Sequence, residues 1–129
     1  MTRTLQWLLV GWFLMLAVWM FFSPMSWYQI TPGVKEMGPF NMHFVMDLGL
    51  VFFASAAAMA YGLYRHDKTA IVCGAFWPVL HATFHIFIWF QRGVPLDLIA
   101  FSNLFGIQLP AWAALFLAFK HPNRRVQNA

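Results

Sequence analysis

The stretch NMHFVMD, Asn41–Asp47, opens an apolar run that continues to about Tyr64. A second stretch, HATFH, His81–His85, lies inside a similar run from about Thr69 to Gln91. About 20 apolar residues in a helix cross the roughly 30 Å of hydrocarbon in a bilayer, and both runs are long enough. These two runs decide the fold, because they predict two membrane-spanning helices that each carry two ionisable side chains four residues apart.

The composition supports a membrane protein. The 129 residues are 61% hydrophobic and only 9% charged, with 15 Phe and 7 Trp, whereas about a quarter of the residues in a soluble domain are charged. The eight basic residues are scattered instead of forming a stripe, so we expect no nucleic-acid partner. The single Cys73 excludes a disulfide within the chain. The expected surroundings are a lipid bilayer.

The apolar runs and the Pro- and Gly-containing segments between them predict an all-α fold. We expect residues 1–129 to form one domain, an integral membrane four-helix bundle. The small residues of Ala54–Ala60 favour close packing of the second helix against the third. Pro78 is expected to kink the third helix and to free a backbone carbonyl. The predicted helices cover residues 5–23, 41–64, 69–91 and 104–120, and the predicted extracytoplasmic loops cover 24–40 and 92–103.

The distribution of Lys and Arg predicts the orientation, because cytoplasmic loops carry an excess of these residues. With both termini in the cytoplasm, six basic residues lie inside and two outside. We therefore expect a multi-pass protein of the cell inner membrane with both termini cytoplasmic. The inside residues are Arg3, Arg65, Lys68, Lys120, Arg124 and Arg125, and the outside residues are Lys35 and Arg92.

The rise of about 1.5 Å per residue gives an expected depth for each ionisable side chain. Counted from Asn41, His43 lies roughly 3 Å and Asp47 roughly 9 Å below the outer face. Counted from the inner face, His81 lies roughly 18 Å and His85 roughly 24 Å up. The prediction is that His85 lies level with His43 and His81 level with Asp47, in the outer half of the membrane.

Three imidazoles and one carboxylate in such a cluster favour a metal site. His43, Asp47, His81 and His85 suit a transition metal ion, namely zinc, copper or iron. Asn41 and Gln108 are the polar side chains expected beside these ligands, where Gln108 would hydrogen-bond a bound water. With an open position, the metal could act on a lipid-soluble small molecule by hydrolytic or oxidative chemistry. The pattern does not identify a catalytic residue.

Other functions fit the same residues. One is haem b held axially by His43 and His85, which leaves Asp47 and His81 unexplained. Another is proton-coupled or small-solute transport, with Asp47 and His81 or His85 as a relay inside a homo-oligomer. A third is a haem- or quinone-binding subunit of a larger membrane complex, in which the cluster meets a partner subunit. No sequence feature separates these alternatives decisively.

The segment Gly38–Gly49 reads G-P-x-N-x-H-F-x-x-D-x-G, and together with His81 and His85 it resembles a pattern in small, uncharacterised bacterial four-helix membrane proteins. The resemblance covers about half of the chain and implies the fold but no activity. The His and Asp constellation is also similar in ligand type to the copper site of particulate methane and ammonia monooxygenases. The order and spacing of the residues differ, so that likeness carries over no functional residue.

Overall fold

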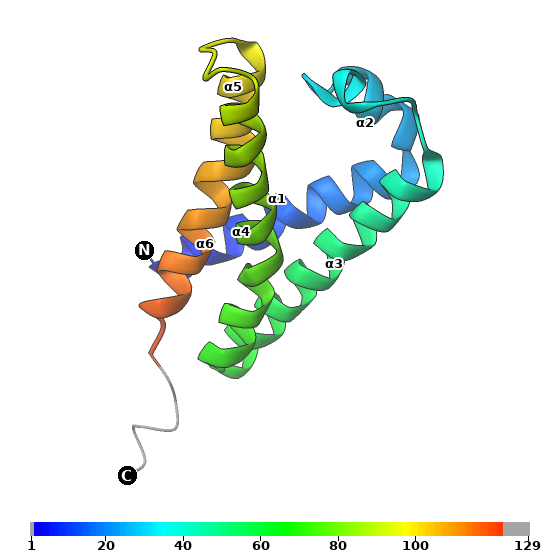
Figure 1. The fold of residues 1–129 in the computed structure, drawn as a ribbon. Helices are drawn as coiled ribbons and strands as arrows, with labels where there is room; N and C mark the ends of the chain where they lie inside the picture. Colours follow the sequence, from blue (N-terminus) through cyan, green and yellow to red (C-terminus); the bar gives the residue numbers. More distant parts are fainter. Residues whose placement is uncertain (1, 123–129) are drawn as a thin grey trace.

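The structure is a computed structural model and describes residues 2–122 of the chain. Every element assigned in this range is helical, as the sequence predicts. Four helical stretches are long and apolar enough to cross a membrane. The elements, labelled in Figure 1 where there is room, are α1 Thr2–Phe22, α2 Pro24–Ile30, the 3-10 helix η1 Val34–Met37, α3 Met42–Arg65, α4 Lys68–Gln91, α5 Leu98–Asn103, the π-helix η2 Leu104–Gln108 and α6 Leu109–Phe119.

Two predicted loops contain helix. The first holds α2, which starts with Pro24 in its first turn, and η1. The second holds α5, and α5, η2 and α6 follow one another without a break, so the fourth apolar stretch begins at Leu98 and not at Leu104. The Asp97 carboxylate starts this helix by accepting a hydrogen bond from the Ala100 N–H at 2.9 Å. The sequence prediction begins this helix at Leu104 because residues 92–103 are less apolar and include Pro95 and Asp97.

α3 packs against both α1 and α4, and α4 also packs against the α5–α6 helix. In Figure 1, α1 lies beside α3 and α4 lies beside α6, and we call these the two helix pairs. The α1–α3 contact depends on Gly49, where an added Cβ would lie 3.0 Å from the Ala17 carbonyl oxygen. The residues of α3 buried in the fold recur at helical spacing and face the core, which sets the rotation of the whole helix. They are Val45, Gly49, Phe52, Ser55, Ala56, Met59, Gly62 and Leu63.

A short turn joins α3 to α4 as an antiparallel hairpin. The Asp67 carboxylate accepts hydrogen bonds from the first N–H groups of α4, at 2.9 Å from Thr69. Within the hairpin the backbones nearly touch. An added Cβ on Gly74 would lie 2.8 Å from the Met59 nitrogen and 2.8 Å from the Ser55 carbonyl oxygen. The small-residue run predicted to allow close packing therefore does so.

Beyond this contact, the two pairs separate. The buried residues of α4 end at Ala82, so its last nine residues bury no side chain fully. In Figure 1 the far ends of α3 and α4 point in different directions. The connections at that end still meet, because an added Cβ on Gly33 would lie 2.8 Å from the Ile99 side chain. The bundle is thus closed along one half and divergent along the other.

The end of the molecule that carries these connections also holds an ion pair. The Arg92 guanidinium donates to the Asp97 carboxylate at 2.6 Å. This hydrogen bond, together with one from the Ala100 N–H, holds the pKa of Asp97 below its usual value. The same carboxylate group therefore starts α5 and ties it to the end of α4.

Pro110 is tolerated in the fourth apolar stretch because α1 supplies a missing donor. Proline has no N–H to offer the preceding turn, and the Trp12 indole N–H donates instead to the Gly106 carbonyl in η2, at 3.2 Å. The irregular turn at η2 and the indole of α1 together accommodate the proline. This hydrogen bond links α1 to the last helix near the middle of the fold.

Replacing Trp12 by Phe should therefore destabilise the protein by about 1 kcal/mol, the usual net worth of one hydrogen bond, plus a smaller loss of contact area. We expect a lower midpoint in detergent-titrated unfolding followed by circular dichroism. Trp7→Phe is the matched control, because the Trp7 side chain is exposed and makes no hydrogen bond in the described structure. Equal midpoints for the two variants would show that the indole N–H contributes nothing.

Candidate functional site

His81 and His85 form an aromatic cluster on α4 near the point where the helix pairs separate. Their ring centroids lie 4.5 Å apart in an edge-to-face arrangement. The His81 ring also stacks on Trp77 at 5.8 Å and meets the Phe52 ring of α3 edge-on at 5.8 Å. Both imidazoles are half-buried. The cluster therefore combines two imidazoles with large apolar ring faces.

Several polar atoms of the cluster lack partners within the fold. The Asn103 side chain at the end of α5 lies near the His85 imidazole. The buried His85 Nδ1 and the buried Trp77 Nε1 have no hydrogen-bond partner in the described structure. An unpaired buried donor or acceptor costs about 1–3 kcal/mol. Such atoms are accordingly places where a bound molecule would gain hydrogen bonds.

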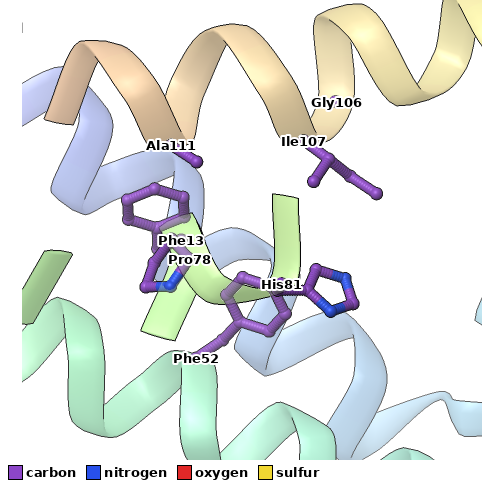
Figure 2. A pocket seen from close by; sticks show the side chains of 7 residues that line it. All are labelled: Phe13, Phe52, Pro78, His81, Gly106, Ile107 and Ala111. Carbon is purple, nitrogen blue, oxygen red and sulfur yellow. The ribbon is translucent and has the colours of Figure 1, made fainter. Parts of the chain in front are cut away.

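A small cavity adjoins His81 at the junction of the helices. Its volume is about 10 Å³, which is room for one water molecule. Figure 2 shows the side chains of α1, α3 and α4 meeting those of η2 and α6 around it, with Pro78 one turn before His81. The lining residues are Phe13, Phe52, Pro78, His81, Gly106, Ile107 and Ala111. Pro78 lies beside the site as expected.

The other predicted pair, His43 and Asp47, lies on the outward face of α3. The His43 Nε2 and the Asp47 carboxylate are 3.3 Å apart, and the two side chains are 87% and 55% exposed. Their orientation follows from the buried series on α3. Val45 and Gly49 face the core, and His43 and Asp47 precede them by two residues, which is more than half a turn of helix.

The heights of the two pairs also differ from the prediction. The Phe52 ring faces the His81 ring, and this contact fixes the register of the antiparallel helices. His85, one turn further along α4, therefore lies level with about Leu48. The predicted partner, His43, is five residues farther along α3, which corresponds to roughly 7 Å of helix. The depth estimate was wrong because it was counted from assumed membrane surfaces and not from the turn that joins the helices.

The structure thus brings His81 and His85 together, and His43 and Asp47 together, but does not join the two pairs. Among residues 2–122, no group of three or more His, Cys, Asp or Glu side chains is arranged to hold a metal ion. A four-ligand centre of these residues is not formed. The binding of zinc, copper, iron or haem b stays a prediction, but the four predicted ligands do not meet in the described part of the chain.

The two residues expected beside the ligands have structural roles. The Asn41 side chain accepts a hydrogen bond from the Phe44 N–H at 3.1 Å and starts α3. Gln108 bridges two helices: its Nε2 donates to the Ala82 carbonyl at 2.8 Å, and its Oε1 accepts from the Trp112 indole at 3.0 Å. Both side chains therefore help to hold the helices of the fold in place.

Sequence reasoning missed Asn103 and Trp77 as members of the cluster. The sequence prediction places Asn103 in a loop. The feature that could have identified it is its polar amide, one turn before the Gly106–Gln108 segment of an otherwise apolar run. Trp77 lies four residues before His81, which places it on the same face of α4. The i, i+4 series of Trp77, His81 and His85 could therefore have been recognised from spacing alone.

Comparison with protein-family models, with curated proteins and with solved structures finds no match to this chain. The resemblance of the Gly38–Gly49 segment to small bacterial membrane proteins stays a prediction.

Proposed function

We propose that the chain is a multi-pass protein of the cell inner membrane with both termini in the cytoplasm. The support is the presence of four apolar helices of spanning length and the distribution of basic residues among the described helix ends. Arg3, Arg65, Lys68 and Lys120 belong to one end of the helices, and Lys35 and Arg92 belong to the other. The excess of positive charge favours the first end as cytoplasmic.

Within this membrane protein, we propose that His81 and His85 bind a lipid-soluble small molecule that carries carbonyl or hydroxyl oxygens, as a quinone does. The single observation that carries this proposal is the pair of imidazoles in the middle of an apolar helix, beside buried polar atoms that lack partners. Ionisable residues inside a membrane are costly and are by default functional.

The location limits what can reach the site. His81 lies roughly 15 Å of helix from the Gln91 end of α4 and roughly 20 Å from the Lys68 end, close to the middle of the span. A molecule dissolved in the acyl chains reaches this depth directly. The divergence of the helix pairs beyond Ala82 leaves the half-buried imidazoles accessible from the side.

The chemistry of the cluster suits such a ligand. An imidazole N–H and the Trp77 indole N–H donate hydrogen bonds to oxygen atoms. The half-buried Trp77 ring and the exposed Phe84 ring beside His85 offer apolar contact to a planar ring. Ligand sites are commonly built in this way, from apolar walls with a few convergent polar groups.

A transition metal ion is the second candidate, favoured by one observation. His81 and His85 are four residues apart on one helix face, and the His85 Nδ1 is unpaired. Two imidazoles at this spacing can share a metal. Because the described residues supply no third ligand of this type, the remaining positions would be filled by water, by the substrate or by a second copy of the chain.

The test is to purify the protein in mild detergent and to analyse what comes with it. Organic extraction with mass spectrometry detects a co-purified quinone or related molecule, and elemental analysis with an optical spectrum detects a metal or haem. We expect a stoichiometric organic ligand in the wild type and its loss in His81→Ala and in His85→Ala.

His43→Ala is the matched control, since it removes an imidazole from the exposed pair on α3. It should retain the ligand in full. A stoichiometric metal that is lost in His81→Ala would favour the transition metal ion over the lipid-soluble molecule. A wild-type protein that carries neither, and that does not bind an added quinone, would contradict both.

A further inference from the structure

A second cluster of polar side chains lies at the opposite end of the helices from α2 and α5. Four residues form this inner basic cluster: Arg3 at the start of α1, His66 in the α3–α4 turn, Lys68 at the start of α4, and His121 after α6. Figure 1 shows the start of α1, the end of α6 and the turn at the same end of the fold. The His66 and His121 rings stack with centroids 5.9 Å apart.

The cations of the cluster are held by backbone carbonyls. Arg3 donates to the Leu63 carbonyl at 3.4 Å, and the Lys68 ammonium donates to the Phe119 carbonyl at 2.7 Å. Such contacts satisfy free carbonyls at the ends of α3 and α6, but a carbonyl carries no full charge. The only ion pairs in residues 2–122 are His43–Asp47 and Arg92–Asp97, so neither cation has a carboxylate within 4 Å.

The hydrogen bonds of Gln6 determine which ring nitrogen of His121 carries a hydrogen. The buried Gln6 donates through Nε2 to the Leu117 carbonyl at 3.0 Å, so its Oε1 is an acceptor. The His121 Nδ1, 3.3 Å from that oxygen, must then carry a hydrogen and donate it. His121 is only 7% exposed, and its Nε2 has no hydrogen-bond partner in the described structure.

The electrostatic surroundings of His121 are positive. Burial lowers the pKa of His121, and the nearby His66, Arg3 and Lys68 lower it further. These groups come from α1, the turn and the start of α4. The Asp67 carboxylate, in the same turn, accepts hydrogen bonds from the Thr69 and Ala70 N–H groups. An anion placed among the basic groups would reverse this effect by favouring the protonated imidazole, whose Nε2–H would then have an acceptor.

We propose that the inner basic cluster binds the phosphate of an anionic phospholipid headgroup. A phosphate group offers several acceptor oxygens and a full negative charge, which suits Arg3, Lys68 and the unpaired His121 nitrogen at once. The cluster lies where the apolar spans end, the level at which headgroups lie in a bilayer. The proposal depends on membrane insertion but not on the His81–His85 site, so each can fail without the other.

The experiment measures thermal unfolding of the detergent-purified full chain with added probes. The probes are phosphatidylglycerol, zwitterionic phosphatidylcholine and inorganic phosphate, each at pH 6 and pH 8. We expect phosphatidylglycerol to raise the Tm clearly more than phosphatidylcholine does, and more at pH 6, because binding is coupled to protonation of His121. An equal rise with inorganic phosphate would support the phosphate site but assign it to a soluble anion.

Two variants tie the effect to the cluster. In Arg3→Gln and Lys68→Gln the amide can still donate to a carbonyl, while the charge is gone, so the rise in Tm caused by phosphatidylglycerol should be at least halved. Lys35→Gln, at the other end of the protein, is the matched control and should keep the full rise. Equal stabilisation by the two lipids, or an undiminished rise in both cluster variants, would overturn the proposal.

Discussion

Gly74→Val should abolish the stable packing of α3 against α4. An added Cβ at this position would lie 2.8 Å from two backbone atoms, the Met59 nitrogen and the Ser55 oxygen. Backbone atoms cannot turn away as a side chain does, so the helices must separate. We expect a loss of more than about 3 kcal/mol in unfolding free energy, at the upper end of what overpacking costs, and much reduced recovery of folded protein from the membrane.

The measurement is denaturant unfolding in detergent micelles, followed by tryptophan fluorescence. Gly11→Val is the matched control, because an added Cβ on the exposed Gly11 meets nothing within 4 Å. The control should unfold close to the wild type, apart from the small helix-propensity change. If Gly74→Val and Gly11→Val unfolded alike, the close contact between α3 and α4 would be wrong.

Gln6→Leu should cost about 3 kcal/mol, the second largest effect we expect from a single change. The Gln6 side chain is 1% exposed and makes two hydrogen bonds, to the Leu117 carbonyl and to His121. Leucine has a similar volume but leaves both partners unpaired at a buried position, and each unpaired group costs about 1–3 kcal/mol.

The same unfolding assay tests this expectation, with Gln29→Leu as the control. Gln29 is an exposed glutamine in α2 that makes no hydrogen bond through its side chain in the described structure. It should change the unfolding free energy by less than about 0.5 kcal/mol, the usual limit for surface substitutions. A Gln6→Leu protein within that same limit would mean that water replaces the lost hydrogen bonds.

The helical class and the four apolar spans could be predicted from the sequence because both depend on local properties. Run length and hydrophobicity identify a span wherever it lies in the chain, and Asn41 starts its helix through a contact only three residues away. The tight hairpin followed from the small residues of Ala54–Ala60. The start of α5 was missed because the capping role of Asp97 was not considered.

The candidate site was predicted only in part, because it depends on rotation and register. Spacing alone places His81 and His85 on one face. Whether His43 joins them depends on which face of α3 packs, and the buried series through Val45, Gly49 and Phe52 decides this. That series is visible in the sequence as small and apolar residues at helical spacing. If this series is used to decide which face of α3 packs against the core, it predicts that His43 and Asp47 lie on the outward face.

The contacts of α1 with the last helix have a consequence for biosynthesis. Trp12 donates to Gly106, and Gln6 donates to Leu117, so the first helix made completes its polar contacts only with the last one. When α1, α3 and α4 have left the ribosome, the residues that carry the Gly106 and Leu117 carbonyls have not yet left it. Nascent chains that stop short of residue 106 should therefore remain open to membrane proteases, and assembly should finish only after translation releases the last helix.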